Sequence, residues 1–205
     1  MSVADPRITF FDDLAERWDD ENPSSEQMVA RLTQNADLLA FKPGESLLEV
    51  GCGTGKTTGY LVEQVAPGRV TAIDFAPRMI DRARGKNIDA DFHCMDICSD
   101  DLGTDRYDVV LCFHSFPHFR DQPAALRNLR RAMKDTGRLI VMHCAGSDHI
   151  NTFHANLTGA VNQDLLPVGD EWQALLDAAG LICQTLIDRD DLFILIAQSD
   201  PRAQR

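Results

Sequence analysis

The sequence predicts a doubly wound α/β fold with a mostly parallel seven-stranded sheet, an antiparallel C-terminal hairpin and an N-terminal helical cap. From residue 44 onward, short apolar segments alternate with segments of helical periodicity, which is typical of parallel strands joined by right-handed crossovers. Proline and glycine mark several boundaries, as at Pro43-Gly44 and Pro67-Gly68. The last two apolar segments have only a polar turn between them, so they predict the hairpin.

Each element is expected from a local pattern. The expected strands are residues 47–50, 69–74, 90–94, 107–113, 138–143, 181–187 and 192–197, with a turn at residues 189–191. The expected helices after residue 44 are residues 57–66 and 77–84, one that Asp121 caps and that ends before Gly137, and one that Asp170 caps. In that last helix Gln173 would complete a capping box, and Gly180 would follow the final turn.

The first 43 residues predict the helical cap. Apolar residues recur at close to helical spacing in residues 9–20 and, more clearly, in residues 25–40. We therefore expect a helical cap at residues 1–43 and one ligand-binding α/β domain at residues 44–205, with the two parts forming one structural unit.

The composition of the chain argues against several classes of binding partner. The net charge of −12 argues against nucleic acid, because an acidic surface repels phosphate. None of the six cysteines forms a Cys-x-x-Cys pair, no leader pattern is visible, and no apolar run approaches the roughly 18 residues that span a bilayer. We expect a cytoplasmic protein that acts on a small molecule, without nucleic acid or membrane as a partner. The oligomeric state cannot be read from the sequence.

A glycine-rich loop at residues 51–55 follows the first expected strand. Glycines permit a tight turn and close approach of a ligand to the backbone, and the next helix directs its N-terminus at the loop. A dinucleotide site would have Gly-x-Gly-x-x-Gly, but Lys56 stands at the last position. A phosphate-binding loop would end as Gly55-Lys56-Thr57 does, but Val50 replaces its first glycine. A glycine-rich turn without a ligand is a further alternative.

Residues 47–55 resemble the first motif of class I S-adenosylmethionine-dependent methyltransferases, a hydrophobic strand and an acid before Gly-x-Gly-x-Gly. The resemblance covers about residues 45–198, although Lys134-Asp135-Thr136-Gly137 departs from the usual Lys-Pro-Gly-Gly. Residues 10–19 look like the opening helix of small-molecule methyltransferases, including quinone-biosynthesis enzymes. That helix lies over the cofactor there, and simple packing on the sheet is the alternative here. The resemblance implies a Rossmann-like fold and S-adenosylmethionine as the cofactor.

Acidic residues follow the expected strands at the edge where such sheets bind ligands. Asp74 can accept hydrogen bonds from a ribose diol, or alternatively can cap the helix that begins at Pro77. The resemblance places Asp96 at the adenine amino group and the Ile97 N–H at the adenine ring, whereas a polar loop is the alternative. The cofactor-binding residues that we expect are Glu49, Gly51, Cys52, Gly53, Gly55, Asp74, Phe75, Met79, Asp96, Ile97 and Phe113.

The histidines predict chemistry beyond cofactor binding. They lie at positions 93, 114, 118, 143, 149 and 154, mostly near the ends of expected strands that share one edge of the sheet. His114, His118 and His143 are candidate catalytic residues, because an imidazole near neutral pH can take a proton from a substrate. Alternatives are a metal site with Asp148 or Cys144, or no chemical role. We assign no metal ligand, and a metal cofactor stays open.

The function that we expect is methyl transfer from S-adenosylmethionine to a small acceptor, with a histidine as a possible general base. Residues 144–168 exceed the usual loop length of about 2 to 6 residues, so we expect a short helix or lid over the substrate. A metal-assisted methyltransferase and a non-catalytic binding protein for S-adenosylmethionine or a nucleotide are the alternatives. The acceptor and its reacting atom are not readable from the sequence.

Overall fold

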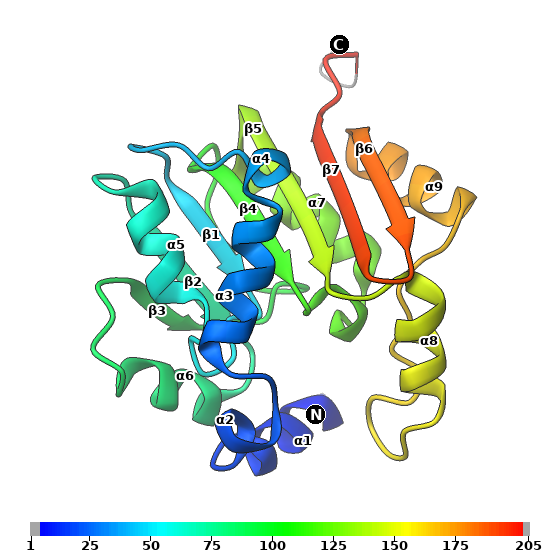
Figure 1. The fold of residues 1–205 in the computed structure, drawn as a ribbon. Coiled ribbons are helices and arrows are strands. Elements are labelled where there is room, and N and C mark those ends of the chain that lie inside the picture. Colours follow the sequence, from blue (N-terminus) through cyan, green and yellow to red (C-terminus); the bar gives the residue numbers. More distant parts are fainter. Residues whose placement is uncertain (1–4, 203–205) are drawn as a thin grey trace. The chain divides into compact units, whose positions relative to one another are not determined.

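The computed structural model describes residues 5–202, and its contacts divide the chain into two compact units, Met1–Met95 and Asp96–Arg205. The strand order is β3-β2-β1 in the first unit and β4-β5-β7-β6 in the second (Figure 1). The strands within each unit run parallel except β7, which is antiparallel to both β5 and β6. These seven strands confirm the predicted fold class. The expected boundary at residue 43 stays a prediction.

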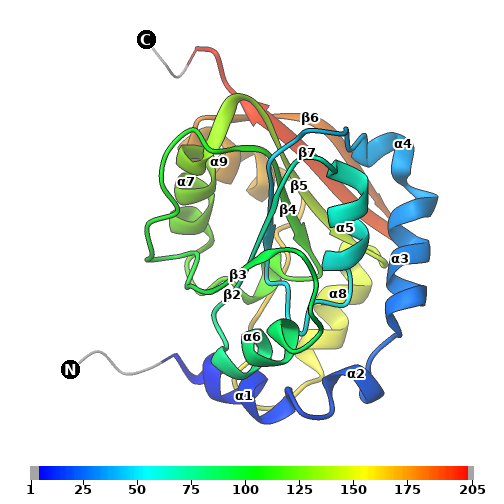
Figure 2. The same cartoon turned by 90° about the vertical axis from the view of Figure 1, so that its left-hand side faces the viewer.

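The first unit holds three parallel strands and the N-terminal helices. Its strands are β1 (Leu47–Val50), β2 (Val70–Asp74) and β3 (Asp91–Cys94). Its helices are α1 (Pro6–Leu14), α2 (Trp18–Glu21), α3 (Ser25–Gln34), α4 (Ala36–Leu39), α5 (Thr58–Val65) and α6 (Pro77–Arg84). The helix α1 lies beside α6 in both views (Figures 1 and 2), where the Arg78 N–H donates to Asp12 at 2.8 Å.

The N-terminal helices are shorter than their periodicity predicts. The expected helix at residues 9–20 is wrong as one element, because a turn at residues 15–17 separates α1 from α2. The expected helix at residues 25–40 divides at Asn35, whose backbone leaves the helical region and whose amide donates to the Arg31 carbonyl. Apolar spacing continues across both breaks, so periodicity alone cannot detect them.

The second unit holds four strands, of which the last two form the C-terminal hairpin. Its elements are β4 (Tyr107–Phe113), a 3-10 turn η1 (Phe116–His118), α7 (Gln122–Ala132), β5 (Met133–His143), α8 (Ser147–Ala155), α9 (Asp170–Ala179), β6 (Leu181–Arg189) and β7 (Leu192–Ser199). Asp121 caps α7 as predicted, since its carboxylate accepts the Ala124 N–H at 2.9 Å. The expected short helix in residues 144–168 is α8.

The start of β5 differs from the prediction. We expected a turn before residue 138, but the strand begins at Met133 and pairs with Tyr107 before its register shifts. A β-bulge of this kind inserts residues into one strand without ending the pairing. Gly137 permits it, because a Cβ there would lie 2.8 Å from the Tyr107 carbonyl oxygen.

The predicted capping box of α9 is wrong. Gly169 at φ +53° is the N-cap, Asp170 is the first helical residue, and no side chain caps the helix. The Glu171 carboxylate instead accepts the Val168 N–H at 2.9 Å. Gly180 ends the helix in the left-handed region as predicted.

The strands of each unit lie in its core, against buried residues of the helices. Leu47, Leu48 and Ile73 are buried in the first unit, and Val110 and Ile140 in the second. Runs that are buried on both faces are typical of parallel strands covered by helices. Among residues 5–202, none of the helices has the length and apolar character that crossing a bilayer requires.

Replacing Gly137 by alanine should destabilise the protein by about 3 kcal/mol, at the upper end of overpacking costs. The added Cβ would meet the backbone oxygens of Tyr107 and Lys134 at 2.8 and 3.0 Å. Gly59→Ala is the matched control, because that position lies in α5 with open space around the new methyl group, so stability should rise slightly. Urea unfolding of both variants checks this, and equal stabilities would contradict it.

Candidate active site

The glycine loop has a backbone that only glycine adopts readily. Gly51, Gly53 and Gly55 have φ values of +74°, +55° and +77°, in the left-handed region that side chains disfavour. The N–H groups of Gly51 and Cys52 both donate to the Ile73 carbonyl, at 2.8 and 3.0 Å. The loop is therefore fixed to the end of β2 and presents its backbone without side chains at three positions.

Asp74 connects the glycine loop with the start of α6. Its carboxylate accepts the Gly53 N–H at 2.8 Å on one oxygen and the Ala76 N–H at 2.9 Å on the other. It is 7% exposed. The alternative in which Asp74 caps the helix that begins at Pro77 is wrong, because Ala76 is the N-cap of α6 and no side chain caps this helix. The ribose role stays a prediction.

Glu49 is buried behind the loop with both oxygens engaged. The Thr57 and Thr58 hydroxyls donate to it at 2.7 and 2.6 Å. Burial raises the pKa of Glu49 to about 7, against the lowering effect of the two hydroxyls. The sequence pattern missed both threonines, which join the end of β1 to the start of α5. The expected contact of Glu49 with the methionine part of the cofactor stays a prediction.

Three other expected cofactor residues differ in exposure. Cys52 packs in an apolar cluster with Ile80 and Phe92, and burial raises the pKa of its thiol well above the usual value. Met79 is 1% exposed, whereas Phe75 is half-buried and touches Phe11 edge-on at 5.6 Å between ring centroids. Among these three, Phe75 therefore has the side chain most available to a ligand.

In the second unit, Asp96 organises the loop after residue 95. Its carboxylate accepts the Cys98 N–H at 2.8 Å and pairs with the Arg120 guanidinium at 2.6 Å. Burial raises its pKa, but the Cys98 N–H and Arg120 outweigh that effect, so the pKa is lowered and the carboxylate stays charged. Ile97 beside it is 5% exposed. The sequence pattern missed Arg120, and the adenine contacts stay a prediction.

His114 follows Phe113 at the end of β4 with a strained backbone. Its φ of +58° is uncommon for a residue with a side chain. Its Nε2 accepts the Cys144 N–H at 3.4 Å, and its ring lies 4.5 Å from that of Phe113. Backbone strain of this kind concentrates at functional sites, so it is consistent with a functional role for His114.

His143 at the end of β5 is the most deeply buried of the three candidate histidines. It is 3% exposed, and its Nε2 has no hydrogen-bond partner among the described residues. Burial, followed by the neighbouring His114, His118 and His154, places its pKa well below the usual value. Because protonation here is costly, His143 suits a neutral role better than that of a general base.

His118 forms a pair with an acid that the sequence pattern missed. Its Nδ1 lies 2.8 Å from a carboxylate oxygen of Asp164, whose side chain is fully buried. His154 Nδ1 contacts the Asp164 backbone carbonyl, and the two rings lie 5.0 Å apart. Burial lowers the pKa of His154. His118 itself is 18% exposed, and Asp164 orients its ring.

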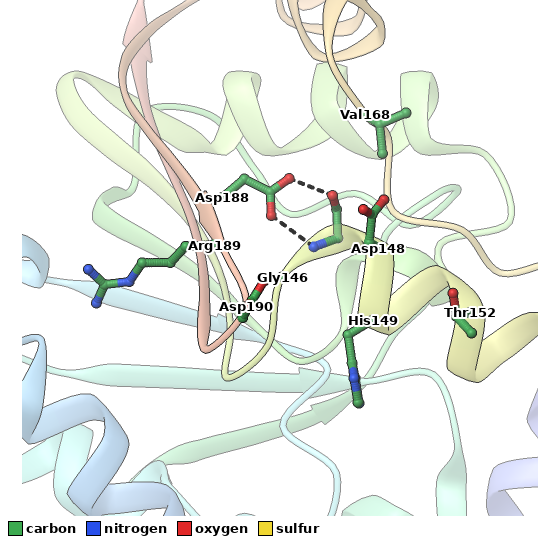
Figure 3. Close-up of a pocket in the computed structure, with 9 residues that line it drawn as sticks. Gly146, Asp148, His149, Thr152, Val168, Asp188, Arg189 and Asp190 are labelled. Atoms are coloured by element: carbon green, nitrogen blue, oxygen red, sulfur yellow. Dashed lines mark hydrogen bonds between the residues drawn. The ribbon is translucent and has the colours of Figure 1, made fainter.

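Two further expectations from the sequence were a metal site at the histidines and a short helix or lid in residues 144–168. Within residues 5–202, histidine, cysteine and acidic side chains form no group of three or more that could hold a metal ion. The segment that contains α8 borders a pocket of about 680 Å³ (Figure 3). Asp188 on the β6–β7 hairpin accepts the Ser147 N–H at 2.9 Å, which fixes the start of α8 beside the hairpin.

This pocket has an anionic lining. Asp148, Asp188 and Asp190 face it, whereas Arg189 pairs with Asp191 at 2.9 Å. We expect it to accept groups that are cationic or that donate hydrogen bonds.

A family model described as a methyltransferase domain matches residues 24–192. The chain belongs to this family. Malonyl-[acyl-carrier protein] O-methyltransferase of Acetivibrio thermocellus is 33% identical over 127 residues, 61% of this chain and 44% of that relative. 27-O-demethylrifamycin SV methyltransferase of Amycolatopsis mediterranei is 28% identical over 179 residues, 80% of this chain and 64% of that relative. The methyltransferase domain thus spans less than two thirds of either relative.

Solved structures agree on the fold of the methyltransferase domain. A SAM-dependent methyltransferase from Aquifex aeolicus has a TM-score of 0.65 at 19% identity, with 86% of this chain and 98% of that chain covered. The Rossmann-like fold is therefore shown. The family match and this fold confirm the predicted class I S-adenosylmethionine-dependent methyltransferase, and with it S-adenosylmethionine as the cofactor of the class.

The buried Glu49 should make stability fall as pH rises. Its pKa is about 7 in the folded methyltransferase domain against an ordinary value of 4.5. The folded state therefore retains a proton that the unfolded state loses between pH 4.5 and 7, so about 3 kcal/mol of stability disappears across that window and not below it. Glu49→Gln should remove this dependence, whereas Glu63→Gln at an exposed position should not. Urea unfolding across this range tests it, and parallel curves for wild type and Glu49→Gln would contradict it.

Proposed function

We propose that this protein transfers a methyl group from S-adenosylmethionine to a small-molecule acceptor. The observation that carries the proposal is the bond between Gly53 and Asp74. It joins a backbone cradle of three left-handed glycines to the carboxylate proposed to hold the ribose. By name, one of the two relatives is an O-methyltransferase of malonyl-[acyl-carrier protein], and the other is a methyltransferase of 27-O-demethylrifamycin SV. These names support a small organic group as the acceptor.

When bound, S-adenosylmethionine would supply an electrophilic methyl group on its sulfonium, which an acceptor's lone pair would take by in-line displacement while the sulfur keeps the bonding electrons. The protein's residues then have to position both reactants, exclude water and accept a proton where the acceptor carries one.

His118 is the residue that we propose as the general base. Asp164 accepts from Nδ1, so it holds the ring in the tautomer whose Nε2 can take a proton. His143 is buried and disfavours the charged form, and His114 Nε2 already accepts a backbone N–H. The pair of His118 and Asp164 therefore fits the base role better than the other two candidates.

Asp74→Ala should weaken binding of S-adenosylhomocysteine by about 100-fold, because charge-assisted hydrogen bonds contribute roughly 1.5 to 3 kcal/mol each. Calorimetry measures this, with Asp89→Ala at an exposed position as the control. The 2′-deoxy analogue separates ribose binding from loop damage. It should bind wild type weakly, and Asp74→Ala should lose little further affinity for it. Equal affinity of wild type and Asp74→Ala for the normal ligand would sink the ribose assignment.

His118→Ala should lower kcat by about 10² to 10⁴ for acceptors that must lose a proton. Production of S-adenosylhomocysteine with a panel of phenols, thiols and quinone precursors measures it, and added imidazole should restore part of the rate. His93→Ala, at an exposed position in β3, is the control. Wild-type rates in His118→Ala would exclude the base role, and binding of the cofactor without turnover of any acceptor would favour a non-catalytic protein.

A further inference from the structure

Lys56 follows the last glycine of the loop and binds the backbone at the end of α2. Its Nζ donates to the carbonyl oxygens of Trp18, Asp19 and Asn22, each at 3.3 Å, and to that of Pro23 at 2.8 Å. An ammonium has three protons, so these four carbonyls share them. The Lys56 side chain is only 10% exposed.

The position of α2 depends on contacts of this kind. It has four residues, and a single helical turn is not stable by itself. The last carbonyls of a helix have no partner within the helix and attract a cation. The Lys56 ammonium supplies that cation from the loop and so fixes the end of α2 to it.

Asp19 on α2 makes a second connection to the same loop. Its carboxylate accepts the Thr54 hydroxyl at 2.5 Å and pairs with Lys86 at 2.8 Å. Burial raises the pKa of Asp19, but the bonds to Lys86 and Thr54 outweigh this and lower it. The negative carboxylate of Asp19 and the positive ammonium of Lys86 therefore both stay charged and attract each other.

These contacts bring Trp18 against the glycine loop. A Cβ on Gly53 would lie 3.7 Å from the indole nitrogen of Trp18. Phe11 meets the same indole edge-on, with ring centroids 5.9 Å apart. The indole thus lies over one of the left-handed glycines that form the proposed cofactor cradle.

The other attachment of the N-terminal segment is weaker. Glu16, in the turn after α1, pairs with Arg78 and Arg82 at 3.1 and 3.2 Å, and all three side chains are well exposed. Exposed ion pairs contribute about 0 to 1 kcal/mol. Lys56, which is largely shielded from water, is therefore, together with the Asp19–Lys86 pair, one of the two charged contacts that determine where α2 lies.

We propose that Lys56 is a positioning residue that holds α2 and Trp18 over the glycine loop and so encloses bound S-adenosylmethionine. This inference rests on the proposed function, because it takes the loop as the cofactor cradle. The ammonium contacts carbonyls of α2 and of the two residues that follow it, so its effect on the cofactor is indirect. Loss of Lys56 should release α2 and let the cofactor dissociate faster.

The first test needs no ligand. The chain has two tryptophans, so Trp172→Phe leaves Trp18 as the fluorescent residue. Acrylamide should quench Trp18 weakly in that background and far more strongly after Lys56→Met, which keeps the apolar stem and removes the charge. Lys42→Met, at an exposed position of the same unit, should leave quenching unchanged.

The second test measures the cofactor. Lys56→Met should weaken binding of S-adenosylhomocysteine by about 10- to 100-fold in calorimetry, the effect of losing charge-assisted hydrogen bonds. It should raise KM for S-adenosylmethionine while kcat is maintained. If Lys56 only maintained the fold, Lys56→Met would instead reduce the fraction of active protein and therefore the apparent kcat. Lys56→Arg, which retains a cation with several donors, should recover part of the affinity.

The outcomes separate this inference from the proposed function. Wild-type quenching and wild-type affinity in Lys56→Met would overturn the role of Lys56. If wild type itself fails to bind S-adenosylhomocysteine, the proposed function fails, and the quenching test still decides whether Lys56 holds α2. Should Lys56→Met not fold, Lys56→Gln removes the charge but keeps a polar group, and the same comparisons apply to it.

Discussion

The first unit depends on one hydrogen bond, between the Gly53 N–H and the Asp74 carboxylate. It fixes a loop whose glycines occupy a region of backbone space that most residues avoid, and it does so with the acid that ends β2. The other carboxylate oxygen accepts a backbone N–H at the start of α6. One side chain therefore sets the loop, the strand end and the next helix relative to each other, so any ligand of the loop meets a preformed surface.

The other acids near the ends of strands β1 and β3 share this property. Glu49 holds two threonine hydroxyls behind the loop, and Asp96 holds a backbone N–H and the Arg120 guanidinium. Each carboxylate thus has a structural partner before any ligand arrives. Ligand recognition by such a residue requires no reorganisation, because its orientation is already fixed by the protein. Structural and binding roles are therefore compatible at Asp74, although the sequence presents them as alternatives.

Features that neighbouring residues in the sequence determine could be predicted, whereas features that depend on contacts between distant residues could not. The helix α6 and the strand β4 match their expected bounds, and Asp121 caps α7, because proline, apolar runs and a capping acid act locally. The start of β5 and the cap of α9 were mispredicted, since register and a glycine N-cap depend on packing. Asp164 lies 46 residues from His118, and the only local signal was an acid beside two leucines.

Lys56 shows how a near-match to a motif can have a physical explanation. The sequence Gly55-Lys56-Thr57 ends as a phosphate-binding loop does, where the lysine would reach a phosphate. Here its ammonium contacts four backbone carbonyls instead, including that of Pro23 at 2.8 Å. Both uses satisfy the same requirement, because a shielded ammonium needs several oxygen acceptors around it. The carbonyls at and just after the end of a short helix meet that requirement, so the Lys56 ammonium is satisfied here by protein oxygens alone.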